Sequence, residues 1–228
     1  MLLPEDFFDL TKTQYADIFE GVEFPWEVLR RIEAYIQSHL QPAILGEVSP
    51  LAYVGERVYI GPGTVVEPGA MIKGPTIIGA GCQVRAGAYL RENVLIGDGV
   101  VVGHTTEIKN SLLFNQAEVP HFAYVGDSVL GWKAHLGAGV KISNVKVNRT
   151  LVVVEVEGKR YETGLRKFGA IIGDQVEIGC NSVLNPGTLV GKRTLGYANL
   201  SMHGYYPPDS IVKLRQSQEI TARLAPPE

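Results

Sequence analysis

The sequence is poor in cysteine, in excess charge and in long apolar runs, and each shortage excludes a class of protein. Its two cysteines, Cys82 and Cys180, lie far apart and outside any C-x-x-C spacing, so we expect two free, buried thiols in a reducing compartment. A net charge of −3 and a pI of about 6.0 provide no basic footprint for nucleic acid and no polybasic patch for anionic lipid.

No apolar run approaches the length of a membrane span, and the first ten residues, MLLPEDFFDL, carry acids in place of the basic start of a signal peptide. We therefore expect a cytoplasmic protein. With 228 residues, 45% of them hydrophobic and 20% charged, the chain has the composition of one large or two small soluble domains.

Glycine is abundant, with 26 residues, and it accompanies a regular aliphatic pattern. Ten aliphatic residues follow one another at a step of six, namely Val54, Ile60, Val66, Ile72, Ile78, Val84, Leu90, Ile96, Val102 and Ile108. A helix cannot keep this period on one face, but a strand can, because six is even. Short strands joined by Gly-assisted corners predict a β-solenoid whose triangular coils contain three hexads each. The step resumes at Leu130 and again at Ile172.

The strict step of six resembles the hexapeptide repeat of left-handed parallel β-helices. We therefore predict an all-β fold, a single-stranded left-handed parallel β-helix with an N-terminal helical segment and a β-hairpin insertion. Residues 1–49 are assigned to the helical segment, 50–215 to the β-helix with a loop insertion at 146–170, and 216–228 to a C-terminal tail.

Two parts of this division have their own sequence signals. Within the first segment, residues 11–20 and 26–40 are expected to be helical and are candidates to cap the first coil, whose open end would otherwise expose apolar side chains. The insertion contains LVVVEVEGKRYE, and its two alternating runs about Glu157 and Gly158 predict a β-hairpin.

Residues 18 apart should lie directly above one another if each coil contains three hexads. The position after each aliphatic residue then forms three columns: Gly61, Gly79 and Gly97; Glu67, Arg85 and Gly103; and Lys73, Arg91 and Lys109. The three stacked cations have two interpretations. They are either long side chains that splay independently into water, or an anion site in which Arg offers phosphate a bidentate fork and Lys a point charge.

The stretch VPHFAYVGD, residues 119–127, follows the cation column and interrupts the rhythm. We expect the repeat to loop outward here and to bring His121 and Tyr124 into a cleft, where the imidazole is a candidate general base. His104, His121 and His135 also raise the alternative of zinc, as in γ-class carbonic anhydrases. No H-x-x-x-H or H-x-x-x-x-H pair is present, so we expect no metal.

Two longer segments carry a family resemblance: EIKNSLLFNQAEVPHFAYVGDSVLGWKAHLGAG and TGLRKFGAIIGDQVEIGCNSVLNPG. They resemble the acetyltransferase half of bifunctional N-acetylglucosamine-1-phosphate uridyltransferase/glucosamine-1-phosphate N-acetyltransferase and related sugar-1-phosphate nucleotidyltransferases, within the hexapeptide-repeat acyltransferase superfamily. The resemblance implies a homotrimer with clefts between subunits, acetyl-CoA as donor, no required metal, and a glucosamine-1-phosphate-like acceptor on the route to UDP-N-acetylglucosamine.

The resemblance also assigns roles to single residues. The general base falls on His121. Substrate-binding positions fall on Arg91, Lys109, Tyr124, His135 and Lys167, with His135 standing where the family carries Asn. The column argument favours Arg91 over Arg85 as the phosphate ligand, although Arg85 fits the local motif RAGA better. Acetyl-CoA contacts fall on Ala138, Asn144, Cys180, Ala198 and Arg215.

The departures from the family leave alternatives open. No uridyltransferase domain precedes the repeat and no L-x-x-G-x-G-T-R-type loop occurs, so we expect no UDP-sugar synthesis by this chain alone. A non-catalytic module, which binds a sugar phosphate or sugar nucleotide or assembles a separate nucleotidyltransferase, is therefore the first alternative. A metal-dependent carbonic anhydrase is the second.

Overall fold

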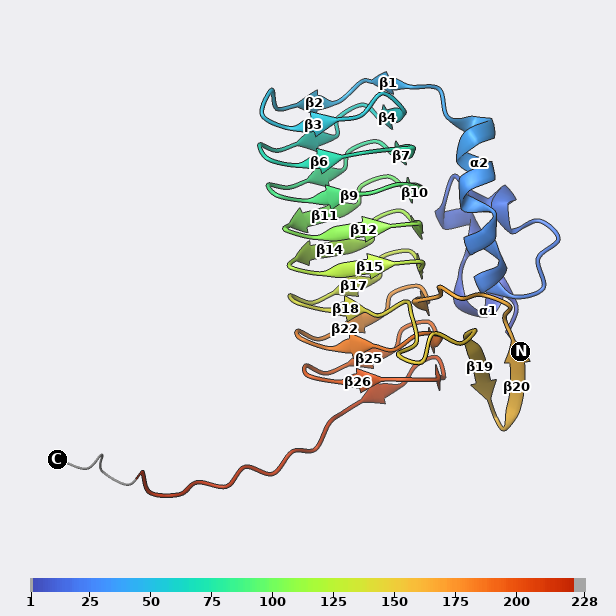
Figure 1. Cartoon of the computed structure of the whole chain (residues 1–228), viewed down its shortest axis with the longest axis vertical. Coiled ribbons are helices and arrows are strands. Elements are labelled where there is room, and N and C mark those ends of the chain that lie inside the picture. Colours follow the sequence, from blue (N-terminus) through green and yellow to red (C-terminus); the bar gives the residue numbers. More distant parts are fainter. Residues whose placement is uncertain (1, 224–228) are drawn as a thin grey trace.

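The computed structural model describes residues 2–223 and forms a left-handed parallel β-helix with three sheets, as predicted (Figure 1). Sheet A contains β1 (Ala43–Ile44), β4 (Val58–Ile60), β7 (Thr76–Ile78), β10 (Val94–Ile96), β13 (Ser111–Leu113), β16 (Val129–Leu130), β21 (Ala170–Ile172), β24 (Thr188–Val190) and β27 (Tyr205–Tyr206). Sheet B contains β2 (Glu47–Val48), β5 (Val65–Val66), β8 (Gln83–Val84), β11 (Val101–His104), β14 (Glu118–His121), β17 (His135–Leu136), β22 (Glu177–Ile178), β25 (Leu195–Gly196) and β28 (Ile211–Val212). Sheet C contains β3 (Tyr53–Val54), β6 (Met71–Ile72), β9 (Tyr89–Leu90), β12 (Glu107–Lys109), β15 (Tyr124–Gly126), β18 (Lys141–Ile142), β23 (Val183–Leu184) and β26 (Ser201–Met202).

The aliphatic residues at the step of six fill the interior of the helix. From Ile60 to Ile108 all nine are buried, and Val54 packs against them from the first coil. The predicted glycine column is also present, because a side chain on Gly79 would overlap the backbone of Gly97 on the next coil. The first strand, β1, begins at Ala43, ahead of residue 50 where the sequence pattern places the start of the β-helix.

The coil length changes where the sequence rhythm breaks. Val94 lies between Thr76, which is 18 positions earlier, and Ser111, which is 17 positions later. The following coil is also one residue short, because Leu112 pairs with Val129. The prediction that the chain loops outward at residues 119–127 is therefore wrong. Val119 and Val125 stay in the core, and the chain absorbs the break by shortening two coils.

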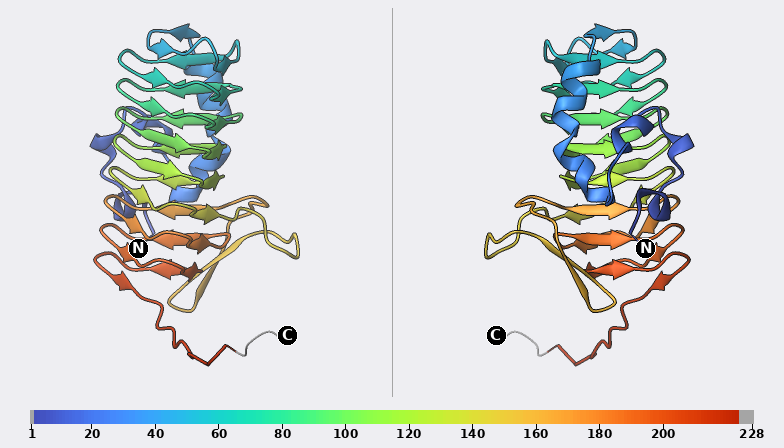
Figure 2. Two further views of the ribbon diagram at one scale, coloured as in Figure 1. Left: turned by 90° about the vertical axis from the view of Figure 1, so that its left-hand side faces the viewer. Right: turned by 90° about the vertical axis from the view of Figure 1, so that its right-hand side faces the viewer.

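The N-terminal segment runs alongside the stack of coils and does not cap it (Figures 1 and 2). It consists of α1 (Pro4–Phe7), three 3₁₀ helices and α2 (Ile32–His39), the 3₁₀ helices being η1 (Leu10–Lys12), η2 (Ala16–Phe19) and η3 (Pro25–Arg30). The expected helix at 11–20 is thus two short 3₁₀ turns, and the one at 26–40 is split between η3 and α2.

The segment shares a second hydrophobic core with the outer face of sheet A. Its aromatic residues, including Phe7, Phe8 and Trp26, pack with outward side chains such as Leu95 and Leu112. The first coil remains uncovered at its end, where Ile44, Leu45 and Leu51 are exposed. The expected cap is wrong, because the apolar residues of the segment are buried against the outer face of sheet A and the open end stays exposed.

The insertion after β18 contains the predicted hairpin, formed by β19 (Val153–Val156) and β20 (Lys159–Glu162). Its two turn residues, Glu157 and Gly158, both have positive φ, as a two-residue hairpin turn with matching twist requires. After the insertion the coils continue in register, since Ile142 pairs with Leu184. No helix among residues 2–223 is long and apolar enough to cross a membrane.

Candidate functional site

The corner between sheets B and C, here called the BC edge, brings together the predicted base and three predicted coenzyme positions. On successive coils this corner is occupied by Ala86, His104, His121, Ala138, Cys180 and Ala198. A ladder of backbone hydrogen bonds shows that these residues stack. The carbonyl of His121 accepts from Gly139 N–H, that of Ala138 from Asn181, and that of Cys180 from Asn199. The residues at these positions are exposed or half-buried, so they form a row along one edge of the molecule that includes His121.

His121 reaches this edge from a regular strand. It is the last residue of β14, and it lies in parallel register with His104, the last residue of β11. The corner that follows is formed by Phe122, whose φ of 52° places it in the left-handed region and whose side chain is 56% exposed. The ring of Phe122 lies 5.4 Å from that of His104 and 6.2 Å from that of His121.

The corner between sheets C and A, here called the CA edge, contains the predicted cation column. Lys73, Arg91 and Lys109 stack on successive coils, because the N–H of Lys73 donates to Leu90 and that of Arg91 to Ile108. Lys109 is then in register with Gly126. The strands of sheet C separate this edge from the BC edge, so the two predicted halves of the site flank one face of the β-helix.

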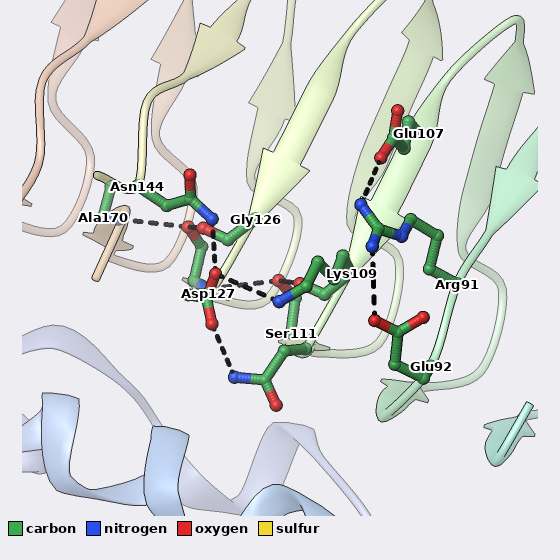
Figure 3. A network of polar contacts seen from close by, with 11 residues as sticks. Arg91, Glu92, Glu107, Lys109, Ser111, Gly126, Asp127, Asn144 and Ala170 are labelled. Atoms are coloured by element: carbon green, nitrogen blue, oxygen red, sulfur yellow. Dashed lines mark hydrogen bonds and ion pairs between the residues drawn. The ribbon is translucent and has the colours of Figure 1, made fainter. Parts of the chain in front are cut away.

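Carboxylates alternate with the cations along the CA edge (Figure 3). Arg91 Nη1 lies 3.1 Å from Glu107 and Nη2 lies 3.3 Å from Glu92. The hydrogen bond to Glu107 and the two negative charges raise the pKa of Arg91 further above its usual range. Burial alone would raise the pKa of Glu92, but its backbone hydrogen bond and the Arg91 charge lower it overall. Arg91 is therefore held by two carboxylates of the protein, whereas Lys73 at the start of the column is exposed.

Asp127 organises the lower part of the CA edge (Figure 3). Its side chain is 6% exposed and lies 3.5 Å from Lys109 Nζ, which is itself 13% exposed. The amide of Asn110 donates to Asp127 Oδ1 at 2.9 Å, and the amide of Asn144 donates to Oδ2. The cation and the two amide donors replace the water contacts that this buried carboxylate loses, so Lys109 and Asn144 are held in fixed positions.

Tyr124 lies on sheet C between the two edges. It is in register with Glu107 on one side and Lys141 on the other. Burial raises its pKa, and the charges of Glu107 and Asp127 raise it further, so the phenol stays protonated and can donate a hydrogen bond. Gly126 leaves room for this ring, because a Cβ there would lie 2.6 Å from Tyr124 Oη and 2.8 Å from the Asn144 amide nitrogen.

Two predicted site residues, His135 and Arg215, lie apart from this face, and Lys167 lies at its border. His135 is on sheet B, where its Nδ1 lies 2.8 Å from Glu177. Lys167 is exposed in the insertion, next to Phe168, whose N–H donates to the carbonyl of Asn144. Arg215 is exposed beyond β28, where the chain leaves the β-helix (Figure 1).

Two further expectations are resolved by position. Arg85 lies near the BC edge and donates to Gln83, so it does not share the column of Arg91. Cys82 is buried as expected, but Cys180 is exposed, because it occupies the outward corner of the BC edge. Among residues 2–223 no group of three or more His, Cys, Asp or Glu side chains is placed to hold a metal ion.

The carboxylates that pair with the cations were not predicted from the sequence. Glu107 was visible as part of E-x-K-x-S, and its position two residues before Lys109 indicated that both side chains share one face of a strand. Glu92 and Asp127 gave no such signal. Glu92 lies two residues after β9 and Asp127 one residue after β15, so the approach of each to Arg91 or Lys109 depends on the corner conformation.

Comparison with known proteins shows relatives with the same repeats. The family described as the GMPPB C-terminal domain matches residues 72–196, more than half of the chain. A bifunctional sugar-1-phosphate nucleotidylyltransferase/acetyltransferase of Sulfurisphaera tokodaii is 40% identical over 87 residues, which are 38% of this chain and 22% of that protein. The bifunctional protein GlmU of Methanococcus maripaludis is 32% identical over 120 residues, 53% of this chain and 29% of its own.

The chain thus spans less than a third of the length of the curated relatives it matches. Among solved structures, a UDP-N-acetylglucosamine acyltransferase from Campylobacter jejuni aligns with 72% of this chain and 70% of its own, at 14% identity and a TM-score of 0.36. At a TM-score this low, the likeness supports no functional conclusion.

Proposed function

Because the chain belongs to the family of the GMPPB C-terminal domain, we propose that it transfers an acetyl group from acetyl-CoA to the amine of an amino-sugar phosphate similar to glucosamine-1-phosphate. One observation carries this proposal. The candidate base and three of the five candidate coenzyme positions, Ala138, Cys180 and Ala198, lie on one edge of the β-helix, across sheet C from the stacked Arg91 and Lys109. Of the other two, Asn144 lies on the CA edge beside Asp127, and Arg215 lies beyond β28. The names of the Sulfurisphaera and Methanococcus relatives support the same reaction class.

In this proposal the CA edge holds the acceptor phosphate. Arg91 offers five N–H donors, and its bonds to Glu92 and Glu107 leave others for phosphate oxygens. Lys109 adds a point charge in a position fixed by Asp127. The protonated phenol of Tyr124 then contacts the sugar above sheet C. Fixing the acceptor between these groups lowers the barrier by positioning, without a covalent intermediate.

The BC edge would hold the donor and carry out proton transfer. His121 takes a proton from the 2-ammonium group, and the free amine attacks the thioester carbonyl carbon. The C–S bond breaks, the imidazolium gives its proton to the thiolate of coenzyme A, and the acylated nitrogen releases its remaining extra proton to water to give the neutral amide. A backbone N–H near Ala138 stabilises the oxyanion, while the coenzyme extends along Cys180 and Ala198. The neighbouring subunit of a trimer would supply the opposite wall of the site. We propose that the reaction takes place in the cytoplasm.

Thiol release from acetyl-CoA, measured with and without glucosamine-1-phosphate, tests the reaction. We expect acceptor-dependent release and N-acetylglucosamine-1-phosphate as product. Folded, trimeric protein that releases no thiol with this acceptor, or with a panel of amino-sugar phosphates and nucleotides, would contradict the proposal.

One observation favours a non-catalytic binding module. His135, which stands where the family carries a sugar-contacting Asn, lies on sheet B beside Glu177, so this predicted acceptor contact does not face sheet C. Acetyl-CoA separates the two functions, because a ligand that binds the folded state raises the melting temperature. An acetyltransferase is expected to be stabilised by acetyl-CoA, whereas a sugar-nucleotide-binding module is stabilised by the sugar nucleotide alone.

A further inference from the structure

A second histidine on the BC edge, His104, is held in one orientation by a hydrogen bond to the preceding coil. The Nδ1 atom of His104 lies 2.6 Å from the carbonyl oxygen of Ala86, one coil earlier. A carbonyl oxygen can only accept, so Nδ1 carries the proton and the neutral ring leaves its lone pair on Nε2. The side chain is exposed, and the edge of the Phe122 ring packs against it. The structure thus presents an imidazole with one defined tautomer to solvent.

The position of His104 relative to the cation column is equally specific. His104 ends β11 and Lys109 ends β12, the next strand of the same coil. His121 belongs to the following coil, which carries Gly126 and the carboxylate of Asp127. An acceptor that crosses sheet C directly from Lys109 therefore meets His104, and one that crosses it diagonally meets His121. Coils are separated by about 4.8 Å, so the two imidazoles are within reach of one amine.

We infer that His104 is a further catalytic residue of the transfer site, with Nε2 as a second acceptor for the proton of the acceptor amine. The inference rests on the proposed acetyl transfer and deepens it. When the amine lies over the coil of Lys109, its N–H bond breaks and the proton moves to His104 Nε2, giving an imidazolium. The amine nitrogen bonds to the thioester carbon, the C–S bond breaks, and the departing thiolate takes up the proton.

The variant His104→Gln tests this role, because a glutamine amide can donate to Ala86 but cannot accept a proton. We expect turnover to fall by about 10-fold or more, with a smaller change in the KM for the acceptor. The double variant His104→Gln/His121→Gln is expected to fall below either single variant, to the rate that positioning and the oxyanion N–H alone support. The control is His39→Gln, at an exposed histidine of α2 on the opposite side of the molecule, whose turnover should equal that of the wild type.

The pH dependence separates a proton acceptor from a structural residue. Removal of His104 is expected to change the acidic limb of the kcat profile, while His39→Gln leaves that limb in place. A His104→Gln protein with wild-type turnover and an unchanged profile would overturn the inference, because the retained Ala86 contact would then be its whole role.

An NMR measurement keeps the inference distinct from the proposed function. In protein labelled with ¹⁵N-histidine, the ring of His104, assigned by its loss in His104→Gln, is expected to show a protonated Nδ1 and a lone pair on Nε2. If wild-type protein releases no thiol, the proposed function fails. The NMR measurement then still shows whether His104 presents a lone pair on Nε2. A proton on Nε2 in the neutral ring would contradict the inference whatever the activity.

Discussion

The outer faces of sheets A and C show how differently two sides of the same repeat can be used. Both sheets enclose one aliphatic core. Sheet A contributes paired residues such as Ile96 and Leu113 to it, and sheet C contributes Leu90 and Ile108. Outward side chains on sheet A are apolar, and the N-terminal segment covers them in a second core. Those on sheet C become polar from β12 to β18, with Glu107, Tyr124 and Lys141 in register. The inner positions thus specify the fold, and the outer ones decide which face is structural and which is available for chemistry.

The largest expected effect is a loss of activity on the sheet C side. His121→Ala should lower turnover by about 10²–10⁴-fold, the range for loss of a general base, while the melting temperature stays close to that of the wild type because the side chain is exposed. Turnover is measured by thiol release from acetyl-CoA, with the melting temperature as the control for folding. Wild-type turnover in the variant would remove His121 from the mechanism.

A truncation on the sheet A side should affect stability instead. Leu112 is fully buried between sheet A and the N-terminal segment, so Leu112→Ala is expected to reduce the free energy of unfolding by about 2–5 kcal/mol. The matched control is Met71→Ala on the outer face of sheet C, where the side chain is 42% exposed and the expected change is within about 0.5 kcal/mol. Equal losses for the two variants in denaturant unfolding would show that the two faces do not differ in this way.

The junction between the N-terminal segment and the β-helix should depend on one buried carboxylate. Asp174 accepts hydrogen bonds from Asp9 N–H at 2.6 Å and from Trp132 N–H at 2.8 Å. In Asp174→Asn an amide N–H faces one of these donors, so we expect a loss of about 1–3 kcal/mol in unfolding free energy, measured by denaturant titration.

The pH dependence of this difference has a defined sign. Burial raises the pKa of Asp174 above 3.8 in the folded state, despite its two hydrogen bonds. A raised pKa contributes stability that is fully present below the unfolded pKa and is lost as the pH rises through the folded pKa. The advantage of the wild type over Asp174→Asn should therefore grow as the pH is lowered toward 3.8. An advantage that shrinks on acidification would contradict the assignment.

The smallest effect distinguishes two arginines. Arg91→Ala should raise the KM for a phosphate-bearing acceptor by about tenfold, the scale of one charge-assisted hydrogen bond. Arg85→Ala, outside the cation column, should change it by less than about twofold, since its guanidinium is satisfied locally by Gln83. The reverse order in steady-state kinetics would show that the phosphate lies nearer the BC edge.

The sequence predicts the features that repeat, and it fails where a feature depends on a single corner or on distant packing. The step of six predicted the sheets and the stacked Arg91 and Lys109, and the alternating runs of the insertion predicted the hairpin turn at Glu157. It did not show that the break near His121 shortens two coils, because a missing residue and an outward loop disturb a periodic pattern in the same way. The pairing of Asp127 with Lys109 was hidden for a similar reason, since it depends on the shortened register.

The attachment of the N-terminal segment also determines the order in which the molecule can be completed. Neighbouring strands of the β-helix join residues 16 to 18 positions apart, or 42 across the insertion, whereas the hydrogen bond between Asp9 and Asp174 spans 165. Contacts of such separation form late, since a long loop must close before they contribute. During synthesis the first residues translated are therefore among the last to form their tertiary contacts. Phe7 and Phe8 can be buried only after the much later coils against which they pack have been translated.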